Sequence, residues 1–399
     1  MSYTAPFAVL FFRFVPTMIE GFWIRNFRSF KHLGIGSGFD IFSVVDGDVD
    51  IDPFELGPVT VFTGDCGVGK STILDAFLFL SDCFYQGLDY TCQKRGGFEN
   101  ILFQGGGNFF SMGIDFRNEG DAEPTTYAVR VGSDKNKVPF IESELLVFRN
   151  TERSFPIIYL QNGVQSIRYL APDESFTSAD LTKIEFTNYN HLGLASLSDH
   201  PKYPVYAAVR KTIENFVLSG ITSDPARGLD GAASRRQFSP RGQSLLGIVR
   251  SLVAQYGDGT PRLLDRIVKF LPNVEEIVLD ATDPDIPKLA FKVDDLARPI
   301  PIAMLSDASV RLLAFALLLE EDNPAPLVAI EEPENGFDGP HLEQYLNLAR
   351  RLIDFPRPLQ LFVTTHSPEI FETISASNIW LLEKRAGEHI VERIGDKIG

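Results

Sequence analysis

The strongest constraint on the fold of this chain is a glycine-rich run between two apolar stretches. Residues 64–71 read Gly-Asp-Cys-Gly-Val-Gly-Lys-Ser, which matches the pattern Gly-x-x-x-x-Gly-Lys-Ser/Thr. The run follows a short β-type segment, residues 59–62, and precedes residues 71–80, whose apolar character predicts a buried helix. A chance match is expected on the order of once in a hundred chains of this length. The order of strand, glycine loop and helix predicts an α/β fold with a phosphate-binding loop.

The chemistry of such a loop is triphosphate binding. Its glycines let backbone N–H groups converge on phosphate oxygens, and the helix N-terminus adds partial positive charge. Lys70 would reach the β- and γ-phosphates, the Ser71 hydroxyl would ligate Mg²⁺, and Thr72 would bond to the α-phosphate. ATP and Mg²⁺ are therefore the expected ligands. The expected nucleotide-binding residues of the loop are Gly64, Asp65, Cys66, Gly67, Val68, Gly69, Lys70, Ser71 and Thr72.

A second element is an apolar strand that ends in acidic residues. Residues 326–330 run directly into Glu331 and Glu332. Because successive side chains at a strand end point in different directions, the two carboxylates face different groups. We expect Glu331 to hold magnesium through water, and Glu332 to orient or deprotonate the attacking water. A solvated strand end is the alternative, which the phosphate loop in the same chain disfavours.

Two further polar clusters adjoin apolar segments. The strand predicted at residues 359–364 stops at Thr365-His366-Ser367, where ligands bind open α/β sheets, so His366 can sense or stabilise a γ-phosphate. The alternative for an isolated histidine is a structural role. Residues 305–311 place Ser306 before the long apolar helix predicted at residues 312–319. Taken alone, this segment is a capped helix.

In their order, these elements resemble the ABC-type ATPase superfamily, in its SMC/RecF-like and overcoming-lysogenisation-defect-like branch. The chain is most similar to the stand-alone bacterial AAA-type ATPases of that branch. The resemblance spans roughly residues 18–390 and is weakest in the middle. The segments that carry it are residues 24–30, the phosphate loop, and residues 95–98, 305–311, 331–335 and 365–368.

The resemblance implies an ATP-driven homodimer. In that family the signature motif of one subunit touches the γ-phosphate held by the other, so Ser306 would act in trans, and Asp338 would belong to the loop that connects the two sites. Gln93 and Gln104 are alternative candidates for a glutamine that couples Mg²⁺ to a side lobe; for each, a surface amide is the competing interpretation. DNA-linked or anti-phage defence roles are also implied.

Three residues depart from the family pattern. Cys66 stands where asparagine is usual, Ala308 replaces the second signature glycine, and Glu331 stands where aspartate is commonest. Ala308 adds a methyl group at a close backbone approach, and Glu331 lengthens the magnesium arm. We therefore expect slow ATP hydrolysis. The competing hypothesis is a nucleotide-binding scaffold that hydrolyses little or no ATP.

The domain organisation follows from the pattern of apolar runs. We expect one composite ATPase domain over residues 18–399, preceded by an extension over residues 1–17, with Met18 as the natural start. Its core sheet is expected to be mostly parallel, with an antiparallel side lobe and a helical insertion within roughly residues 107–300. The remaining predicted segments are a Gly-rich bend at 34–38, an alternating strand near 41–51, antiparallel strands over 107–170, helices at 205–219, 242–271 and 341–353, a polar loop at 223–242, a strand pair at 277–281 and 289–293, and a last strand at 379–383.

The overall charge and the cysteines narrow the choice of partners. A formal charge of −16 repels nucleic acid and anionic lipid on average, so any nucleic-acid contact must be local. Arg25, Arg28 and Lys31, or the arginines between residues 227 and 241, could line such a groove; solvated surface is the alternative. Three cysteines without zinc or disulfide spacing indicate a reducing compartment, and hence the cytoplasm.

The sequence gives no sign of a second domain on which the nucleotide site could act. No stretch is long and apolar enough for a membrane helix, and nothing suggests docking to one, so a transporter subunit fits poorly. The interval from Lys70 to Leu305 carries no heptads, so the long coiled coil of SMC proteins does not fit there. Residues 367–399 are too few for the nuclease domain of overcoming-lysogenisation-defect proteins. We therefore expect a separate effector protein.

Overall fold

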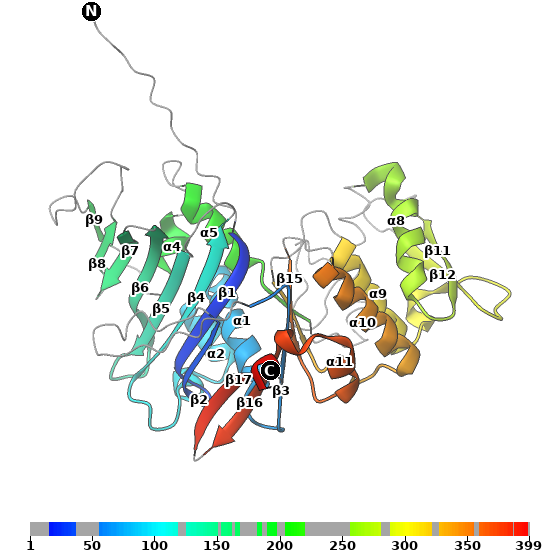
Figure 1. Ribbon diagram of the computed structural model, residues 1–399. Helices are drawn as coiled ribbons and strands as arrows, with labels where there is room; N and C mark the ends of the chain where they lie inside the picture. Colours follow the sequence, from blue (N-terminus) through cyan, green and yellow to red (C-terminus); the bar gives the residue numbers. More distant parts are fainter. Residues whose placement is uncertain are drawn as a thin grey trace, which may run out of the picture.

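A computed structural model describes most of the 399-residue chain, and every structural statement below refers to this described part. The strands lie in three sheets of eight, six and three strands. Figure 1 shows the eight-stranded sheet on one side of the molecule and most of the later helices on the other. The described residues are 16–36, 56–118, 125–150, 153–161, 164–167, 182–185, 190–197, 204–219, 256–280, 288–320, 327–354, 359–385 and 387–397.

The six-stranded sheet carries the phosphate loop. Its strands are, in spatial order, β10 (Val217–Ser219), β14 (Leu327–Glu331), β15 (Gln360–Thr364), β3 (Val59–Gly64), β16 (Ile379–Arg385) and β17 (Glu388–Arg393). The first five are parallel, and only β17 is antiparallel. Both faces of the sheet are covered, which explains why β14 and β15 are continuous apolar runs rather than alternating ones. The expected mostly parallel core sheet is confirmed.

The eight-stranded sheet is antiparallel throughout. Its strands are β2 (Phe30–Gly36), β1 (Pro16–Phe27), β4 (Phe109–Asn118), β5 (Thr125–Ser133), β6 (Pro139–Asn150), β7 (Arg153–Gln161), β8 (Val164–Ile167) and β9 (Thr182–Glu185). The antiparallel strands expected over residues 107–170 are therefore confirmed. Two N-terminal strands, β1 and β2, complete the same sheet, so the side lobe is continuous with the start of the described chain.

Helix α1 (Lys70–Gln86) packs between these two sheets. The ring of Phe77 lies 4.9 Å from that of Phe22 on β1 and 5.4 Å from that of Phe362 on β15, measured between centroids. The helix is apolar on nearly all sides because both of its neighbours are sheets. The other helices on this side are α2 (Leu88–Lys94), α3 (Phe98–Ile101), α4 (Gly193–Leu197) and α5 (Pro204–Glu214).

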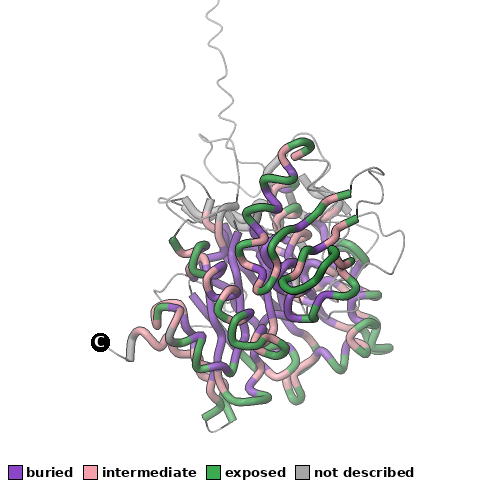
Figure 2. The backbone as a smooth tube through the Cα atoms, turned by 90° about the vertical axis from the view of Figure 1, so that its right-hand side faces the viewer, coloured by how far each residue is buried: buried purple, intermediate pink, exposed green. Residues whose placement is uncertain are grey.

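A second layer covers the opposite face of the six-stranded sheet. Helices α9 (Asp307–Glu320) and α10 (Gly339–Asp354) pack on one another and on that sheet, with α8 (Thr260–Ile267) and α11 (Pro368–Thr373) beside them. The three-stranded sheet lies at the outer end of this layer (Figure 1). Its strands are β11 (Val274–Asp280), β12 (Lys288–Val293) and β13 (Ile300–Pro301). Figure 2 shows buried segments through the middle of the molecule. They form two clusters, one on each face of the six-stranded sheet.

Two sequence predictions are wrong in detail. The helix expected over 205–219 ends at Glu214, because Val217–Ser219 pairs with β14 as a strand and sheet pairing overrides the local apolar pattern. The Gly-rich bend at 34–38 begins as part of β2, where a Cβ on Gly36 would lie 2.1 Å from the Glu20 carbonyl oxygen. Strands β9 and β17 were not predicted.

Several predicted segments fall outside the described residues. They are residues 1–15 of the expected extension, the strand near 41–51, the polar loop at 223–242 and residues 242–255 of the second expected helix. Among the helices that are described, none combines the length and apolar character needed to cross a bilayer.

Candidate functional site

The phosphate loop takes its shape from glycines that adopt left-handed backbone angles. Gly64, Gly67 and Gly69 have φ of 141°, 77° and 106°, and Gly69 is the residue before the first helical residue of α1. A Cβ on Gly69 would lie 2.6 Å from Cζ of Phe30, which presses on the loop from the start of β2. A Cβ on Gly67 would meet nothing within 4 Å, so that side of the loop is open to a ligand.

Lys70 lies inside this loop, with only 5% of its surface exposed. Its Nζ donates to the carbonyl oxygens of Gly64, at 2.9 Å, and Asp65, at 3.0 Å. Burial lowers the pKa of Lys70 below its ordinary value, and the negative charge of Glu332 opposes that shift. A buried ammonium group held by two carbonyls is placed to exchange those bonds for phosphate oxygens.

The ends of three neighbouring parallel strands bring the predicted catalytic residues to Lys70. Nε2 of His366, after β15, lies 2.9 Å from Nζ of Lys70 and 3.2 Å from Oε1 of Glu332, after β14. Strand order β14-β15-β3 explains this meeting, because the carboxyl ends of parallel strands share one edge of the sheet. The lysine loop and the second acidic residue therefore form a single site.

Glu332 has an unusual backbone conformation, with φ of +40°. Left-handed angles are uncommon outside glycine and cluster at functional sites. The Glu332 N–H still donates to the Thr364 carbonyl at 2.8 Å, and Nδ2 of Asn335 donates to its Oε2 at 2.6 Å. Glu331 is the last strand residue and pairs with Thr364. The backbone turn after Glu331 is what directs the second carboxylate toward His366.

Glu334 is a site residue that we did not assign from the sequence. Its Oε1 accepts from the Thr365 hydroxyl at 2.6 Å and from the His366 backbone N–H at 2.7 Å. Its Oε2 is buried with no hydrogen-bond partner among the described residues. Glu334 thus ties the segment after β14 to the segment after β15. The signal was present, because a third acidic residue follows Glu331 and Glu332 in the same motif.

The residues expected near magnesium are compatible with that ion. Ser71 is exposed at the start of α1, and Glu331 is half-buried at the end of β14. The described residues contain no cluster of three or more His, Cys, Asp or Glu side chains that could hold a metal ion alone. Mg²⁺ suits such a site, because it binds through one or two protein oxygens together with water and substrate phosphates.

Ser306 and Asp338 lie in the second layer, at the N-termini of α9 and α10. Ser306 caps α9, since its Oγ accepts from the Ser309 N–H at 3.1 Å, and Asp338 caps α10 by accepting from the His341 N–H at 3.1 Å. Both residues are exposed. The expected N-cap at Ser306 is confirmed, whereas the trans roles of both residues stay predictions.

The lesser candidates have ordinary surroundings. Thr72 Oγ1 lies 3.2 Å from the Ser29 hydroxyl, and Gln93 and Gln104 are both exposed. Cys66 is exposed in the loop. Arg25 lies over the ring of Phe109, with 5.5 Å from Cζ to the centroid.

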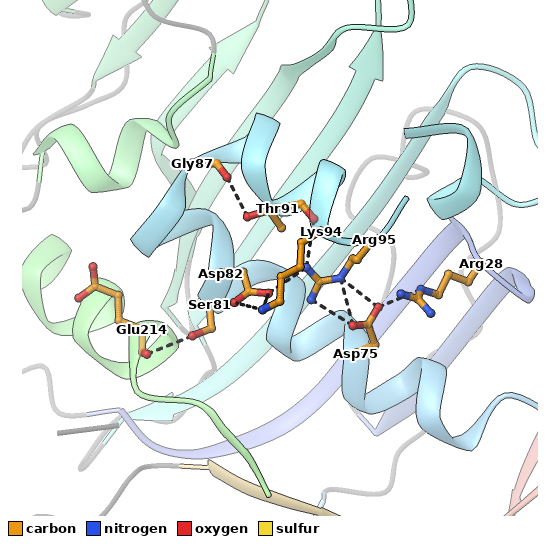
Figure 3. Close-up of polar contacts among 9 residues, drawn as sticks. All are labelled: Arg28, Asp75, Ser81, Asp82, Gly87, Thr91, Lys94, Arg95 and Glu214. Atoms are coloured by element: carbon orange, nitrogen blue, oxygen red, sulfur yellow. Dashed lines mark hydrogen bonds and ion pairs between the residues drawn. The ribbon is translucent and has the colours of Figure 1, made fainter. Parts of the chain in front are cut away.

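An ion network fastens the helix that begins at the phosphate loop (Figure 3). Asp75 of α1 binds Arg28 at 2.9 Å and Arg95 at 3.0 Å, and Asp82 binds Arg95 at 2.8 Å and Lys94 at 3.1 Å. Arg95 is 5% exposed and lies over the Phe79 ring. The network joins α1 to α2 and to the β1–β2 turn. Arg28, one of the candidate nucleic-acid contacts, is thereby engaged within the chain.

Comparisons with known proteins place the chain in a family. Residues 59–372 match the family described as AAA domain, putative AbiEii toxin, Type IV TA system. The retron Ec83 probable ATPase of Escherichia coli is 24% identical over 374 residues, covering 81% of this chain and 67% of that protein.

Solved structures show the same fold. A Smc head bound to the C-winged helix domain of ScpA superposes with a TM-score of 0.57 at 16% identity, over 95% of this chain and 99% of that one. A Smc head with an extended coiled coil, bound to the C-terminal domain of ScpA derived from Pyrococcus furiosus, gives a TM-score of 0.52 at 14% identity, over 96% and 98%. The chain therefore belongs to the AAA-domain family of putative AbiEii type, and it is a P-loop ATPase with an ABC/SMC-like fold.

Proposed function

We propose that this protein is an ATP-hydrolysing switch that closes into a homodimer around two ATP molecules and controls a separate effector protein. The observation that supports it best is the contact between Lys70, His366 and Glu332, which come from three distant parts of the chain. A lysine on phosphate, a carboxylate for the water and a histidine between them are the groups that ATP hydrolysis requires.

Each residue has a distinct task in this proposal. Lys70 leaves the carbonyls of the loop and binds the β- and γ-phosphates of the substrate. Glu332 accepts a proton from, or orients, the attacking water, and His366 donates to the γ-phosphate. Ser71 and, through water, Glu331 would hold Mg²⁺, which would neutralise charge on the bound triphosphate.

The homodimer rests on the exposed signature segment. Ser306 and Asp338 are exposed at the N-termini of α9 and α10, which leaves them accessible to a phosphate held by a second copy. The Smc heads with this fold are bound to parts of ScpA, a separate protein, and the retron relative is a probable ATPase. These relatives support an effector on another chain, with a DNA-linked or anti-phage defence role. We also propose that residues 18–399 act as one unit in the cytoplasm.

Slow turnover belongs to the same proposal. Ala308 is buried at the start of α9, where its methyl group occupies the place of the usual glycine, and Glu331 is longer than the usual aspartate. The competing function is a scaffold in which bound ATP is structural. It predicts tight ATP binding with negligible hydrolysis.

Nucleotide binding and turnover in three proteins decide between these functions. The wild type should bind ATP and release phosphate, and Lys70→Ala should lose both activities because the β- and γ-phosphates lose their cation. Glu332→Gln should keep ATP binding and slow turnover by roughly 10²–10⁴, the scale of general-base catalysis. Equal turnover in wild type and Glu332→Gln would show that Glu332 is misassigned, and binding without turnover in the wild type would favour the scaffold.

A further inference from the structure

Ser306 and Asp338 are joined inside the subunit by a chain of hydrogen bonds. Oδ1 of Asp338 lies 2.6 Å from Nδ1 of His341, and Nε2 of His341 lies 3.0 Å from Oγ of Ser309. Oγ of Ser309 lies in turn 2.9 Å from Oγ of Ser306. The two outer residues are exposed, whereas Ser309 and His341 are 6% and 5% exposed. The chain thus links two surface residues through the interior.

This geometry is held by the two helices that carry it. Ser306 and Asp338 are the N-caps of α9 and α10. Ser306 accepts from the backbone N–H of Ser309, and Asp338 accepts from the backbone N–H of His341. Each cap therefore also bonds to the next residue in the chain of hydrogen bonds. The Phe337 ring stacks beside the His341 ring, at 6.5 Å between centroids and 11° between planes. The helices α9 and α10 pack together, which holds Ser309 and His341 within hydrogen-bond distance of each other.

The order Asp, His, Ser is that of a hydrolase triad, but the surroundings do not suit a nucleophile. Ser309 is buried, and its hydroxyl is occupied on both sides by His341 and Ser306. A buried hydroxyl cannot reach a substrate carbonyl. The chain is therefore suited to setting the direction of hydrogen bonds rather than to bond cleavage.

The neutral histidine ring fixes that direction. A carboxylate only accepts, so Nδ1 of His341 carries the hydrogen and donates to Asp338, and Nε2 must accept. Nε2 then accepts a hydrogen bond from the Ser309 hydroxyl, and the Ser309 oxygen in turn accepts one from the Ser306 hydroxyl. With neutral His341, the single hydroxyl hydrogen of Ser306 is therefore turned inward.

Protonation of the ring reverses the chain. Nε2–H of the imidazolium donates to Ser309. The Ser309 hydroxyl is then free to donate to Oγ of Ser306, and this leaves the Ser306 hydrogen directed outward. It then points beyond the N-terminus of α9, where the helix N–H groups favour an anion. The exposed Asp338 carboxylate stabilises the positive ring, and the hydrogen bond from His341 keeps the pKa of Asp338 below its ordinary value.

We propose that His341 is a positioning residue, whose protonation turns the Ser306 hydroxyl from an inward donor into a donor to an anion outside the subunit. The anion is a γ-phosphate held by a second copy of this chain, and only that identification rests on the proposed function. Proton uptake and ATP-dependent dimerisation are then coupled within each subunit.

Several of the described elements that pack against α10 or α9 carry charged side chains. On α9 they are Asp307 and Arg311, and Arg311 donates from Nη1 to the Asn335 carbonyl. Strand β3 carries no charged residue, and α11 contributes Glu369. The 3-10 turn with Lys269 packs near the far end of α10, where Arg351 lies over Phe270. Asp338 is the carboxylate that binds the ring directly.

The test is the pH dependence of ATP-driven dimerisation. In a Glu332→Gln background with ATP and Mg²⁺, the dimer dissociation constant is measured by sedimentation between roughly pH 5 and 8, the range in which imidazoles titrate. We expect dimers to tighten as pH falls, with His341 contributing up to about tenfold per pH unit for each linked proton. Ser309→Ala keeps the His341–Asp338 pair but interrupts the chain, so it should lose this contribution.

Two further variants sharpen the comparison. His341→Gln, whose amide can donate to Ser309 but cannot titrate, should lose the same contribution while still dimerising. Glu343→Gln, at an exposed position two residues along α10, should keep the parent slope. If Ser309→Ala and His341→Gln both retain the full slope of the parent, the proposal is overturned even though the dimer forms.

A second measurement is independent of dimerisation. Nitrogen NMR of labelled histidines in the nucleotide-free wild type should show neutral His341 as the Nδ1–H tautomer, assigned among the six histidines by its loss in His341→Gln. An Nε2–H tautomer would refute the hydrogen-bond chain, whatever the oligomeric state. Absence of any ATP-dependent dimer would instead refute the proposed function. The His341 tautomer would then be the measurement that tests the hydrogen-bond chain.

Discussion

At the residue scale, the site depends on side chains whose backbone is not regular. Lys70 follows a glycine with φ of 106°, and Glu332 itself has φ of +40°. The sequence predicted both residues because the motifs around them are distinctive. It could not predict the left-handed turn at Glu332, since glutamate has no local preference for that conformation and it is imposed by the Thr364 and Asn335 contacts.

Glu334 provides the first test at this scale. Glu334→Ala removes the acceptor shared by Thr365 and the His366 N–H, so His366 loses its fixed position between Lys70 and Glu332. We expect turnover to fall roughly tenfold to a hundredfold, the effect of a small misplacement of a catalytic group, with ATP binding retained. Turnover kinetics and ATP titration measure both. Glu343→Ala, at an exposed position of α10, is the control, and unchanged turnover in Glu334→Ala would contradict the positioning role.

At the element scale, the ion network around Arg95 fixes α1 against α2. Arg95 is 5% exposed and touches two carboxylates that are themselves mostly buried. Arg95→Met should lower the free energy of unfolding by about 3 kcal/mol. It leaves Asp75 paired only with Arg28, and Asp82 only with Lys94, and both of these partners are more exposed than Arg95. Chemical denaturation measures this loss.

The matched control for this network is Lys94→Met. Lys94 binds the same Asp82 but is 38% exposed, so its removal should cost no more than about 1 kcal/mol. Equal losses for the two variants would show that the buried contacts of Arg95 are not the source of its stabilisation.

A buried carboxylate in the antiparallel sheet gives a pH prediction. Glu144 of β6 accepts from the Gly193 and Leu194 N–H groups, at 2.5 and 2.9 Å, and from the Tyr127 hydroxyl at 2.8 Å. Burial raises its pKa, and the three donors only partly offset that shift. The folded chain therefore holds this proton more tightly than the unfolded chain, so the stabilising contribution is greatest at low pH and is lost as pH rises through the raised pKa.

Comparison with Glu144→Gln isolates that contribution. The unfolding free energy of wild type minus that of Glu144→Gln should fall as pH rises above about 4, where an ordinary glutamate ionises. A difference that stays constant with pH would mean that the carboxylate is not perturbed in the folded protein.

At the scale of the whole molecule, the sequence predicted individual strands and helices better than the long-range strand pairings that connect them. The parallel strands other than β10, together with α1 and the apolar helix α9, have strong apolar signals and lie where expected. The pairing of β1 with β4, and of Val217–Ser219 with β14, joins segments about a hundred residues apart. Such pairings depend on tertiary packing rather than on local propensity, so no window of sequence reveals them.

The central claim concerns the whole molecule and is tested by its mass in solution. Light scattering of Glu332→Gln with Mg²⁺ and ATP should give a mass near twice the 44.4 kDa of one chain, and the same protein with ADP should give one chain. Lys70→Ala should remain a monomer with either nucleotide. A monomer in all conditions, for a variant shown to bind ATP, would contradict the account of this protein as an ATP-closed dimer.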